Sequence, residues 1–438
     1  MTDAARATEA QLIRAVGVLA LTAAVINVVI GGGIFRLPSS IAANMGPSAP
    51  VAFIAGALAI IPITLCFAAA GSRVSTTGGP YTYAAAAFGN FWGFVTGALM
   101  WIGNVVSGPG VANALNQQIA QVVPGLGEGL PRAAFFVVLY GVLVAMNAFG
   151  VKLGARAIVV LATIKLTPLV LLAAIGVFFV DWSLVSFTTI PSWSAFGASM
   201  IMVMFAYSGI ETALMPSGEV RDPARDVPRA ALTALVIVVL IYIGVQVVAQ
   251  GVLGGALKGH PAPLAATAGA IWSPGFAILL ATASVSMFGF LMGNVFGSSR
   301  AVYALARDGY LPAPIAHVTE RYRVPLNAVL LHAGLGCLFA IFSEFDFLIT
   351  LSGGANCVVY VAVAVAAWKL EREDRRLHGE PFRLPGGTLA IPLISVVAMV
   401  AILTTLKLDE WVAMVAGLVA LVLIYALLTA VRGRTPTA

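Results

Sequence analysis

Gly31-Gly32-Gly33-Ile34-Phe35-Arg36-Leu37-Pro38 interrupts one apolar segment, and Phe205-Ala206-Tyr207-Ser208-Gly209-Ile210-Glu211 interrupts a second one much later in the chain. Three consecutive glycines weaken a helix by roughly 1 kcal/mol each, whereas helix-packing motifs space glycine at one-turn intervals on one face. We therefore predict that the backbone unwinds at both places. Unwound backbone inside a bilayer requires protein or a water-filled cavity to satisfy its N–H and C=O groups. A matching pair of such breaks indicates the substrate site of a transporter.

The composition is that of an integral membrane protein. Hydrophobic residues make up 60% of the 438 residues and charged residues 10%, and the mean hydropathy is +0.99. These values lie outside the range of soluble globular proteins. Apolar windows of about 20 residues, enough to cross about 30 Å of hydrocarbon, recur along the chain. We predict an all-α fold with twelve transmembrane helices, near residues 15–37, 47–70, 84–112, 132–150, 157–180, 195–218, 230–254, 271–304, 325–343, 346–368, 389–406 and 410–431.

The positions of the two breaks predict how these helices are organised. The first break falls in predicted helix one and the second in helix six, so each half contains five helices. An odd number forces the halves into opposite membrane orientations, which is an inverted 5+5 repeat. The expected parts are a cytoplasmic N-terminal tail (1–14), two repeats (15–180 and 195–368), a charged cytoplasmic loop (369–388), two additional helices (389–431) and a cytoplasmic C-terminal tail (432–438).

The basic net charge of +6 reports topology rather than an acidic partner. Of the 24 Lys and Arg residues, nineteen fall in segments predicted to be cytoplasmic, and Lys165 falls within a helix. The four on the opposite side are Arg36, Arg132, Lys258 and Lys407. This bias places both termini in the cytoplasm. We expect a multi-pass protein of a bacterial inner membrane whose partners are the lipid bilayer and a small molecule, with no nucleic acid.

Two breaks in facing helices suit an amino acid. A break exposes N–H groups, which bind anions, and C=O groups, which bind cations. A zwitterionic amino acid carries both charges on one carbon. We expect its carboxylate at the N–H groups of Gly31–Gly33 and its ammonium at the carbonyls that end the first halves of helices one and six.

Ionisable side chains within membrane helices are functional candidates. Lys165 lies nine residues beyond Arg156, about 13 Å along the helix, which is too deep for easy access to the interface. It is either an ammonium held among backbone carbonyls at a helix break or a lysine that releases its proton in a dry site. Glu211 either stabilises the start of the half-helix after the second break or couples protons.

Polar and aromatic residues near the breaks have two readings each. Asn104 and Asn294, in helices three and eight, make interhelical hydrogen bonds or face the central site. Phe205 and Tyr207 cover a substrate or pack against other helices. His332 is expected to be a packing residue.

Several segments together resemble the amino acid–polyamine–organocation transporters. Residues 31–38 resemble the first-helix motif of that family, and residues 205–211 look like its sixth-helix motif. Residues 218–230 and 299–309 resemble its cytoplasmic connections. Trp101-Ile102-Gly103-Asn104 is similar to the bacterial arginine/agmatine antiporter branch. The resemblance spans roughly residues 14 to 431.

This resemblance implies a leucine-transporter-like fold with alternating access around a midplane site. It implies that the first-helix glycines hold the carboxylate, that Phe205 is an aromatic gate, and that Asn104 and Asn294 contact the substrate side chain. Lys165 matches a lysine that replaces a sodium ion and supports proton coupling in some members but also occurs in sodium-independent exchangers. The predicted substrate-binding residues are Val28, Ile30, Gly31, Gly32, Gly33, Asn104, Phe205, Ala206, Ser208, Gly209 and Asn294.

One departure from the arginine/agmatine branch bears on the substrate. That branch carries a polar residue in the last turn before its glycines, where this chain has Val28-Val29-Ile30, with Asn27 out of register. We therefore expect a secondary transporter of neutral L-amino acids, proton-coupled or exchanging. The alternative is a cationic amino acid or polyamine antiporter, for which Glu211 is the available carboxylate.

Other classes fit the sequence poorly. A membrane enzyme needs an acid/base pair, a nucleophile with its base or a metal cluster, and the apolar segments contain none in a suitable pattern. There is no Gly-x4-Gly-Lys-Ser/Thr motif for ATP, so a gradient must drive transport. We expect no enzyme activity, no cofactor and no metal, and a monomer or homodimer.

Overall fold

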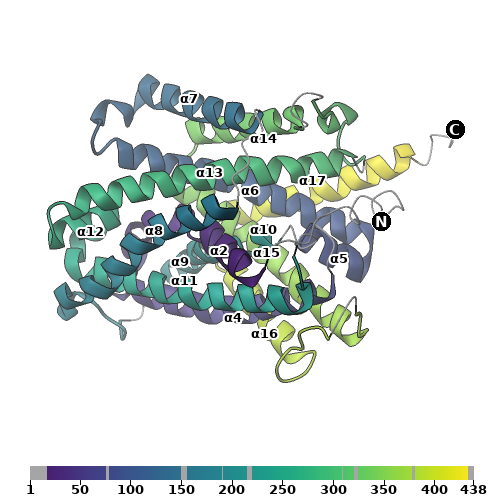
Figure 1. Ribbon diagram of the computed structural model, residues 1–438, viewed down its shortest axis with the longest axis horizontal. Coiled ribbons are helices and arrows are strands. Elements are labelled where there is room, and N and C mark those ends of the chain that lie inside the picture. The colour runs from purple at the N-terminus through teal and green to yellow at the C-terminus, as the bar shows by residue number, and fades with distance from the viewer. Residues whose placement is uncertain are drawn as a thin grey trace.

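The computed structural model describes residues 17–74, 78–148, 155–189, 191–214, 220–307, 309–319, 324–376 and 380–432. Within these ranges the fold is all-helical (Figure 1). Eight helical segments there are long and apolar enough to cross a membrane, and four shorter apolar helices accompany them. The predicted N-terminal tail, residues 433–438 of the C-terminal tail and the basic residues Lys152, Arg321 and Arg323 lie outside the described residues.

The helices follow one another in the order α2 (Val18–Val29), α3 (Leu37–Met45), α4 (Ala49–Arg73), α5 (Pro80–Phe88), α6 (Asn90–Ile119), α7 (Gly129–Ala148), α8 (Ala155–Gly176), α9 (Trp193–Tyr207), α10 (Ile210–Ala213), α11 (Pro223–Leu253), α12 (Pro263–Ile271), α13 (Gly275–Arg307), α14 (Leu326–Phe342), α15 (Phe345–Arg372), α16 (Ala390–Leu403) and α17 (Leu408–Arg432). The long helices α4, α11 and α13 run along the longest dimension of the molecule in Figure 1.

Both helices that carry the glycine motifs are interrupted there. Helix α2 ends at Val29, a 3₁₀ turn spans Gly33–Phe35, and α3 begins at Leu37. Helix α9 ends at Tyr207, and α10 begins after Gly209, whose φ of +123° is a conformation that side chains with a Cβ rarely adopt.

The third predicted helix differs from the structure at both ends. A short helix α5 precedes it, and Gly89, with φ +91°, separates α5 from α6. Helix α6 then continues to Ile119, beyond the apolar window that ended at residue 112. Polar side chains in this last part bond within the protein, since Asn113 Nδ2 donates to the Ala340 carbonyl at 3.2 Å and Gln118 Nε2 to the Phe35 carbonyl at 3.4 Å. The apolar window ended early because these side chains are polar and a hydropathy scale takes no account of their hydrogen-bond partners.

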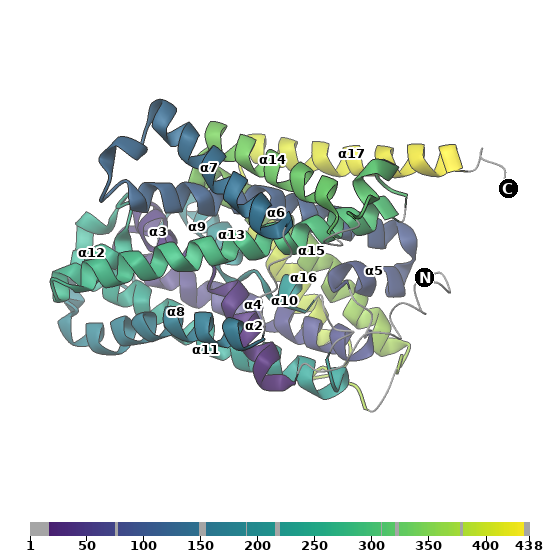
Figure 2. The same cartoon turned by 45° about the horizontal axis from the view of Figure 1, so that its top comes forward.

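Helices of the first half contact helices five positions later in the predicted order. Helix α4 contacts α11, α6 contacts α13, and α7 contacts α14. The broken helices cross-pair, because α2 contacts α10 and α3 contacts α9. Figure 1 shows α2 in the middle of the view, and Figure 2 shows α7, α14 and α17 together along its upper side. The two breaks are thereby brought to the centre of the fold.

A buried ion pair closes one end of the bundle. Arg73, at the end of α4, lies 3.6 Å from Glu371, near the end of α15, and both side chains are almost fully buried. The segment after α15 is held to the same place, because Glu371 accepts the Leu384 N–H at 3.0 Å and Ser72 Oγ accepts the Phe382 N–H at 3.1 Å. These contacts join the charged loop to α4.

We predict that replacing Gly353 destabilises the bundle. Gly353 of α15 lies against the backbone carbonyl of Ile201 in α9, so a Cβ there would overlap a group that cannot rotate away. Gly353→Ala should cost about 1–3 kcal/mol and lower the apparent Tm in detergent. Gly417→Ala in α17 is the matched control, because nothing lies within 4 Å of a Cβ at that position. Equal Tm values for the two variants would contradict close packing of α15 on α9.

Candidate functional site

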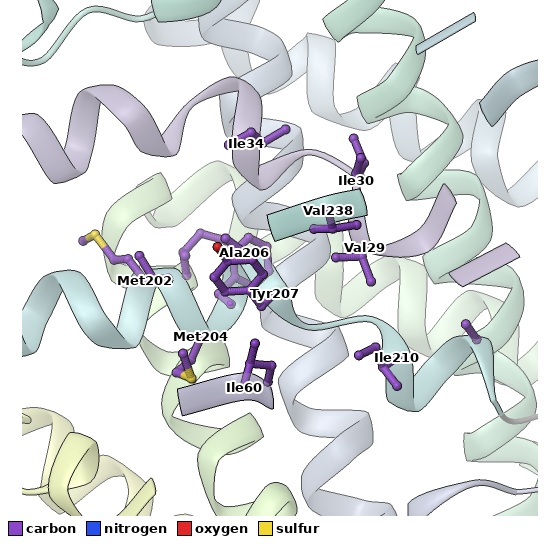
Figure 3. Packing of buried hydrophobic residues seen from close by; sticks show 14 of the residues in the cluster. Val29, Ile30, Ile34, Ile60, Met202, Met204, Ala206, Tyr207, Ile210 and Val238 are labelled. Carbon is purple, nitrogen blue, oxygen red and sulfur yellow. The ribbon is translucent and has the colours of Figure 1, made fainter. Parts of the chain in front are cut away.

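The two breaks face each other at the centre of the molecule. A Cβ on Gly209 would lie 3.1 Å from Val29 Cα, and a Cβ on Gly33 would lie 2.9 Å from Phe205 Cε1. Figure 3 shows Val29 and Ile34, from either side of the first break, in one apolar cluster with Tyr207 and Ile210 from the second. The backbone of α2 lies this close to Gly209 and the ring of Phe205 lies this close to Gly33, so a Cβ at either position would force a neighbour to shift.

A cavity of about 100 Å³ lies beside the breaks. Helices α2, α6, α9, α10, α13 and α15 contribute to its wall. Most lining side chains are polar but uncharged, and Glu211 is the one ionisable residue among them. The lining residues are Asn27, Val28, Asn104, Ser107, Phe205, Ser208, Gly209, Glu211, Thr212, Gly289, Phe290, Gly293, Asn294, Ser298, Ser352 and Asn356.

Seven of the residues singled out from the sequence line this cavity, and the remaining ones do not. The seven are Val28, Asn104, Phe205, Ser208, Gly209, Glu211 and Asn294. Ile30, Gly31, Gly32, Gly33 and Ala206 lie behind the wall, all of them buried. The rings of Phe290 and Phe205, which do line the cavity, pack directly on Gly31 and Gly33, and Val111 packs on Gly32. Aromatic side chains therefore separate the glycine backbone from the cavity.

The carbonyls exposed where α2 ends are already hydrogen-bonded. Lys165 Nζ donates to the carbonyls of Asn27 at 2.7 Å and Ile30 at 2.9 Å. Tyr242 OH donates to the Val29 carbonyl at 2.9 Å. Ser286 Oγ lies 2.8 Å from the Gly31 carbonyl and 3.2 Å from that of Ile30. Three helices, α8, α11 and α13, thus supply the donors that an unwound segment needs in an apolar surrounding.

Lys165 is held at the negative end of a half-helix. Its side chain is 4% exposed and does not line the cavity. Both of its carbonyl partners belong to the last turn of α2 or follow it directly, where the helix dipole favours a cation. Lys165 Nζ therefore lies among backbone carbonyls at the first helix break.

Glu211 is bound through both carboxylate oxygens. Oε1 accepts the Gly209 N–H at 2.9 Å, and Oε2 accepts the hydroxyl of Tyr360, from α15, at 3.1 Å. The carboxylate therefore stabilises the start of α10 and connects it to α15, while it also borders the cavity.

Asn104 and Asn294 occupy the same wall of the cavity. Asn294 Nδ2 donates to the Asn104 carbonyl at 3.2 Å, so it bonds across helices and also lines the cavity. His332, expected to be a packing residue, is buried and places Nε2 3.0 Å from Asn294 Oδ1.

Sequence reasoning missed several residues at the site. Asn27, considered out of register, lines the cavity because its helix ends two residues later and does not continue the periodicity. Tyr242 and Ser286 gave no signal in the sequence, since tyrosine and serine are common in membrane helices. Ser352 and Asn356, one turn apart on α15, form a polar stripe that could have been recognised.

A second polar cluster lies at the end of the bundle opposite the Arg73–Glu371 pair. It joins the segment after the first break to neighbouring helices and loops. Arg36 donates to Gln117 Oε1 at 3.2 Å and to the His260 carbonyl at 2.7 Å. Ser40 Oγ donates to Asp346 Oδ1 at 2.7 Å. Burial, and then the neighbouring Arg36 guanidinium, lower the pKa of His260. Movement of α3 would have to break these contacts.

Known proteins resemble this chain along almost its whole length. The profile described as amino acid permease matches residues 16–431, almost the whole chain. The chain belongs to the amino acid permease family. This permease is similar to a serine/threonine exchanger of Bacillus subtilis, with 28% identity over 84% of this chain and 86% of the relative. It is also similar to a branched-chain amino acid permease of the same organism, with 25% identity over 95% of this chain and 92% of the relative.

Other relatives carry different names. A polyamine transporter of Oryza sativa subsp. japonica is 26% identical over 86% of this permease and 72% of the relative. These relatives are transporters rather than enzymes, and the substrates in their names differ. Their likeness therefore indicates a membrane transporter of amino acids and related small molecules, with the substrate left to the site itself.

We predict that Lys165→Met destabilises the permease. The variant loses the ammonium, leaves the Asn27 carbonyl without its donor and removes the shorter of the two hydrogen bonds to the Ile30 carbonyl. A buried acceptor without a partner costs about 1–3 kcal/mol, so the apparent Tm in detergent should fall. Lys258→Met is the control because Lys258 is exposed. A Tm equal to that of the control variant would show that the ammonium does not hold the first break.

Proposed function

We propose that this permease is a secondary active transporter of neutral L-amino acids that works by alternating access. The observation that carries the proposal is the cavity at the meeting point of two helix breaks, where most of the lining side chains are polar but uncharged and Glu211 is the one ionisable residue. A ligand with two opposite charges on one carbon needs backbone groups rather than charged side chains. Its cavity of about 100 Å³ is small compared with the several hundred Å³ typical of drug-sized ligands, which favours a small substrate.

The proposed architecture is twelve transmembrane helices in an inverted 5+5 repeat, with residues 15–180 and 195–368 as the repeats and 389–431 as two additional helices. The counterpart contacts α4 with α11, α6 with α13 and α7 with α14 support this arrangement. So does the crossed pairing of the half-helices, since α2 meets α10 and α3 meets α9. Residues 369–388 form the proposed cytoplasmic loop.

The proposed binding mode uses the backbone at both breaks. None of the hydrogen bonds in the described part of the chain uses the N–H of Gly32 or Gly33, so these donors are available for the substrate carboxylate. Displacement of the Phe205 and Phe290 rings would open the way to them. Since the last carbonyls of α2 are taken, the ammonium would bind the carbonyls of Val28, Ala206 and Tyr207.

Proton coupling and exchange remain two forms of this proposal. Lys165 occupies a place where a cation is required between the first break and α8. Loss of its proton would remove the charge that the end of α2 favours and weaken both of these hydrogen bonds, and so favour movement of α2. Glu211 is the second candidate, because it connects α10 to Tyr360 of α15 beside the cavity. In an exchanger both groups keep their charge and only position the breaks.

A cationic amino acid or polyamine antiporter is the second candidate function. The carboxylate of Glu211 at the cavity favours it, and the Oryza relative is named as a polyamine transporter. Against it, both Glu211 oxygens already accept hydrogen bonds from this chain. The neutral substrate is therefore the better supported of the two.

We further propose that the permease lies in a bacterial inner membrane with both termini cytoplasmic, as a monomer or homodimer. Arg36 and Arg132 mark one end of the bundle and the Arg73–Glu371 pair the other. The charge bias of the sequence assigns the Arg73 end to the cytoplasm.

Uptake of a panel of labelled amino acids into proteoliposomes tests the function. The vesicles would be empty or preloaded with the same amino acid, with and without an inward proton gradient. We expect neutral amino acids to enter. Gradient-driven uptake into empty vesicles, with a pH dependence that Lys165→Met removes, would identify a proton symporter. Uptake into preloaded vesicles alone would identify an exchanger. Entry of polyamines or arginine, without neutral amino acids, would refute the proposal in favour of its alternative.

Phe205→Ala tests the proposed gate. The ring lines the cavity and covers Gly33, and burying such a side chain contributes about 1.5–3 kcal/mol. Its loss should lower the transport rate by about tenfold or more. Phe196→Ala is the control, since Phe196 lies on the same helix near the end remote from the break. Transport by Phe205→Ala at the rate of this control would remove Phe205 from the gate.

A further inference from the structure

His332 is a buried titratable residue that the proposed transport cycle does not use. It lies on α14, its side chain is 2% exposed, and it does not line the cavity. Its Nε2 is 3.0 Å from Oδ1 of Asn294, whereas no partner of its Nδ1 occurs among the described residues. A buried imidazole with one bonded nitrogen is held by that bond and by packing alone.

The hydrogen bonds of Asn294 determine which atom of its amide faces His332. Nδ2 lies 3.2 Å from the Asn104 carbonyl and 3.5 Å from Ser107 Oγ. A carbonyl only accepts, so the amide nitrogen must point to α6 and the amide oxygen to α14. His332 Nε2 must then carry the hydrogen and donate it. The chain of donors runs from His332 through Asn294 to Asn104 and connects α14, α13 and α6.

The flipped amide is excluded from the α6 side. It would place the amide oxygen against the Asn104 carbonyl, a repulsive contact whichever tautomer His332 adopts. Close packing supports the observed arrangement, because a Cβ on Gly108 would lie only 2.8 Å from Asn294 Oδ1. After these bonds the amide oxygen retains one lone pair and the second N–H faces Ser107 Oγ at 3.5 Å, while Asn294 borders the cavity together with Asn104 and Ser107.

We infer that His332 is a positioning residue for substrate selection: through its Nε2–H it orients the Asn294 amide so that the cavity recognises an uncharged, hydrogen-bonding side chain, such as a hydroxyl, over an aliphatic one. This inference rests on the proposed function and names the substrate class of the same site. A site with oriented buried polar groups discriminates against a ligand that leaves them unpaired.

The transport test compares serine with alanine, which differ by one hydroxyl, in proteoliposomes. His332→Leu should raise the ratio of the KM for serine to the KM for alanine about tenfold, the loss expected for one oriented hydrogen bond. His332→Gln offers an amide N–H in place of Nε2–H and should restore the ratio towards that of the wild type. His317→Leu is the control, since His317 is exposed. Asn294→Ala combined with His332→Leu should change the ratio no further than Asn294→Ala alone.

A purely structural role gives different results. It would change the maximal rate or the Tm while serine and alanine stay equally affected, or it would leave His332→Gln no better than His332→Leu. Either outcome overturns the inference.

A second measurement is independent of transport. Histidine-selective ¹⁵N NMR of the intact permease should show His332 as the Nε2–H tautomer, with a signal that shifts in Asn294→Ala. An Nδ1–H tautomer would refute the pairing even if serine is transported. Conversely, the Nε2–H tautomer in a permease that moves no neutral amino acid would refute the proposed function and leave the pairing in place.

Discussion

The structure depends on the satisfaction of the backbone where α2 stops. An apolar surrounding offers no water to the carbonyls freed by the unwinding, so donors must come from other helices. Lys165, Tyr242 and Ser286 provide them from α8, α11 and α13. Because these donors come from three different helices, the first break connects α8, α11 and α13 to one another. A change in any of these bonds would alter the position of the half-helix.

This arrangement divides the break into two functional sides. The carbonyl side is bonded within the protein and needs a resident cation, whereas the N–H groups of Gly32 and Gly33 stay without an intrachain partner in the described residues. The ring of Phe205 packs on Gly33 and that of Phe290 on Gly31, whereas Val111 packs on Gly32. Two rings that line the cavity, one from α9 and one from α13, therefore cover part of this backbone.

The ends of the bundle have different contacts around this centre. At one end Arg36, just before α3, donates hydrogen bonds to the Gln117 side chain and to the His260 carbonyl. At the other, Arg73 and Glu371 form a buried ion pair that also holds the charged loop. Removing one partner of a buried pair leaves an uncompensated charge, so such a pair is costly to separate. The Gln117 side chain and the His260 carbonyl, to which the Arg36 guanidinium donates, are neutral groups, unlike the carboxylate at the Arg73 end.

The sequence by itself determined the class of protein, the positions of both helix breaks and seven residues of the cavity wall, because hydropathy and consecutive glycines act locally along the chain. The tertiary structure alone decided what each polar group contacts. Asn27 reached the cavity because α2 ends just after it, and His332 met Asn294 across two helices. Neither contact leaves a trace in local sequence, since the partners lie far apart in the chain. The glycines were found as a motif, but only the packing of aromatic rings over them separates them from the cavity.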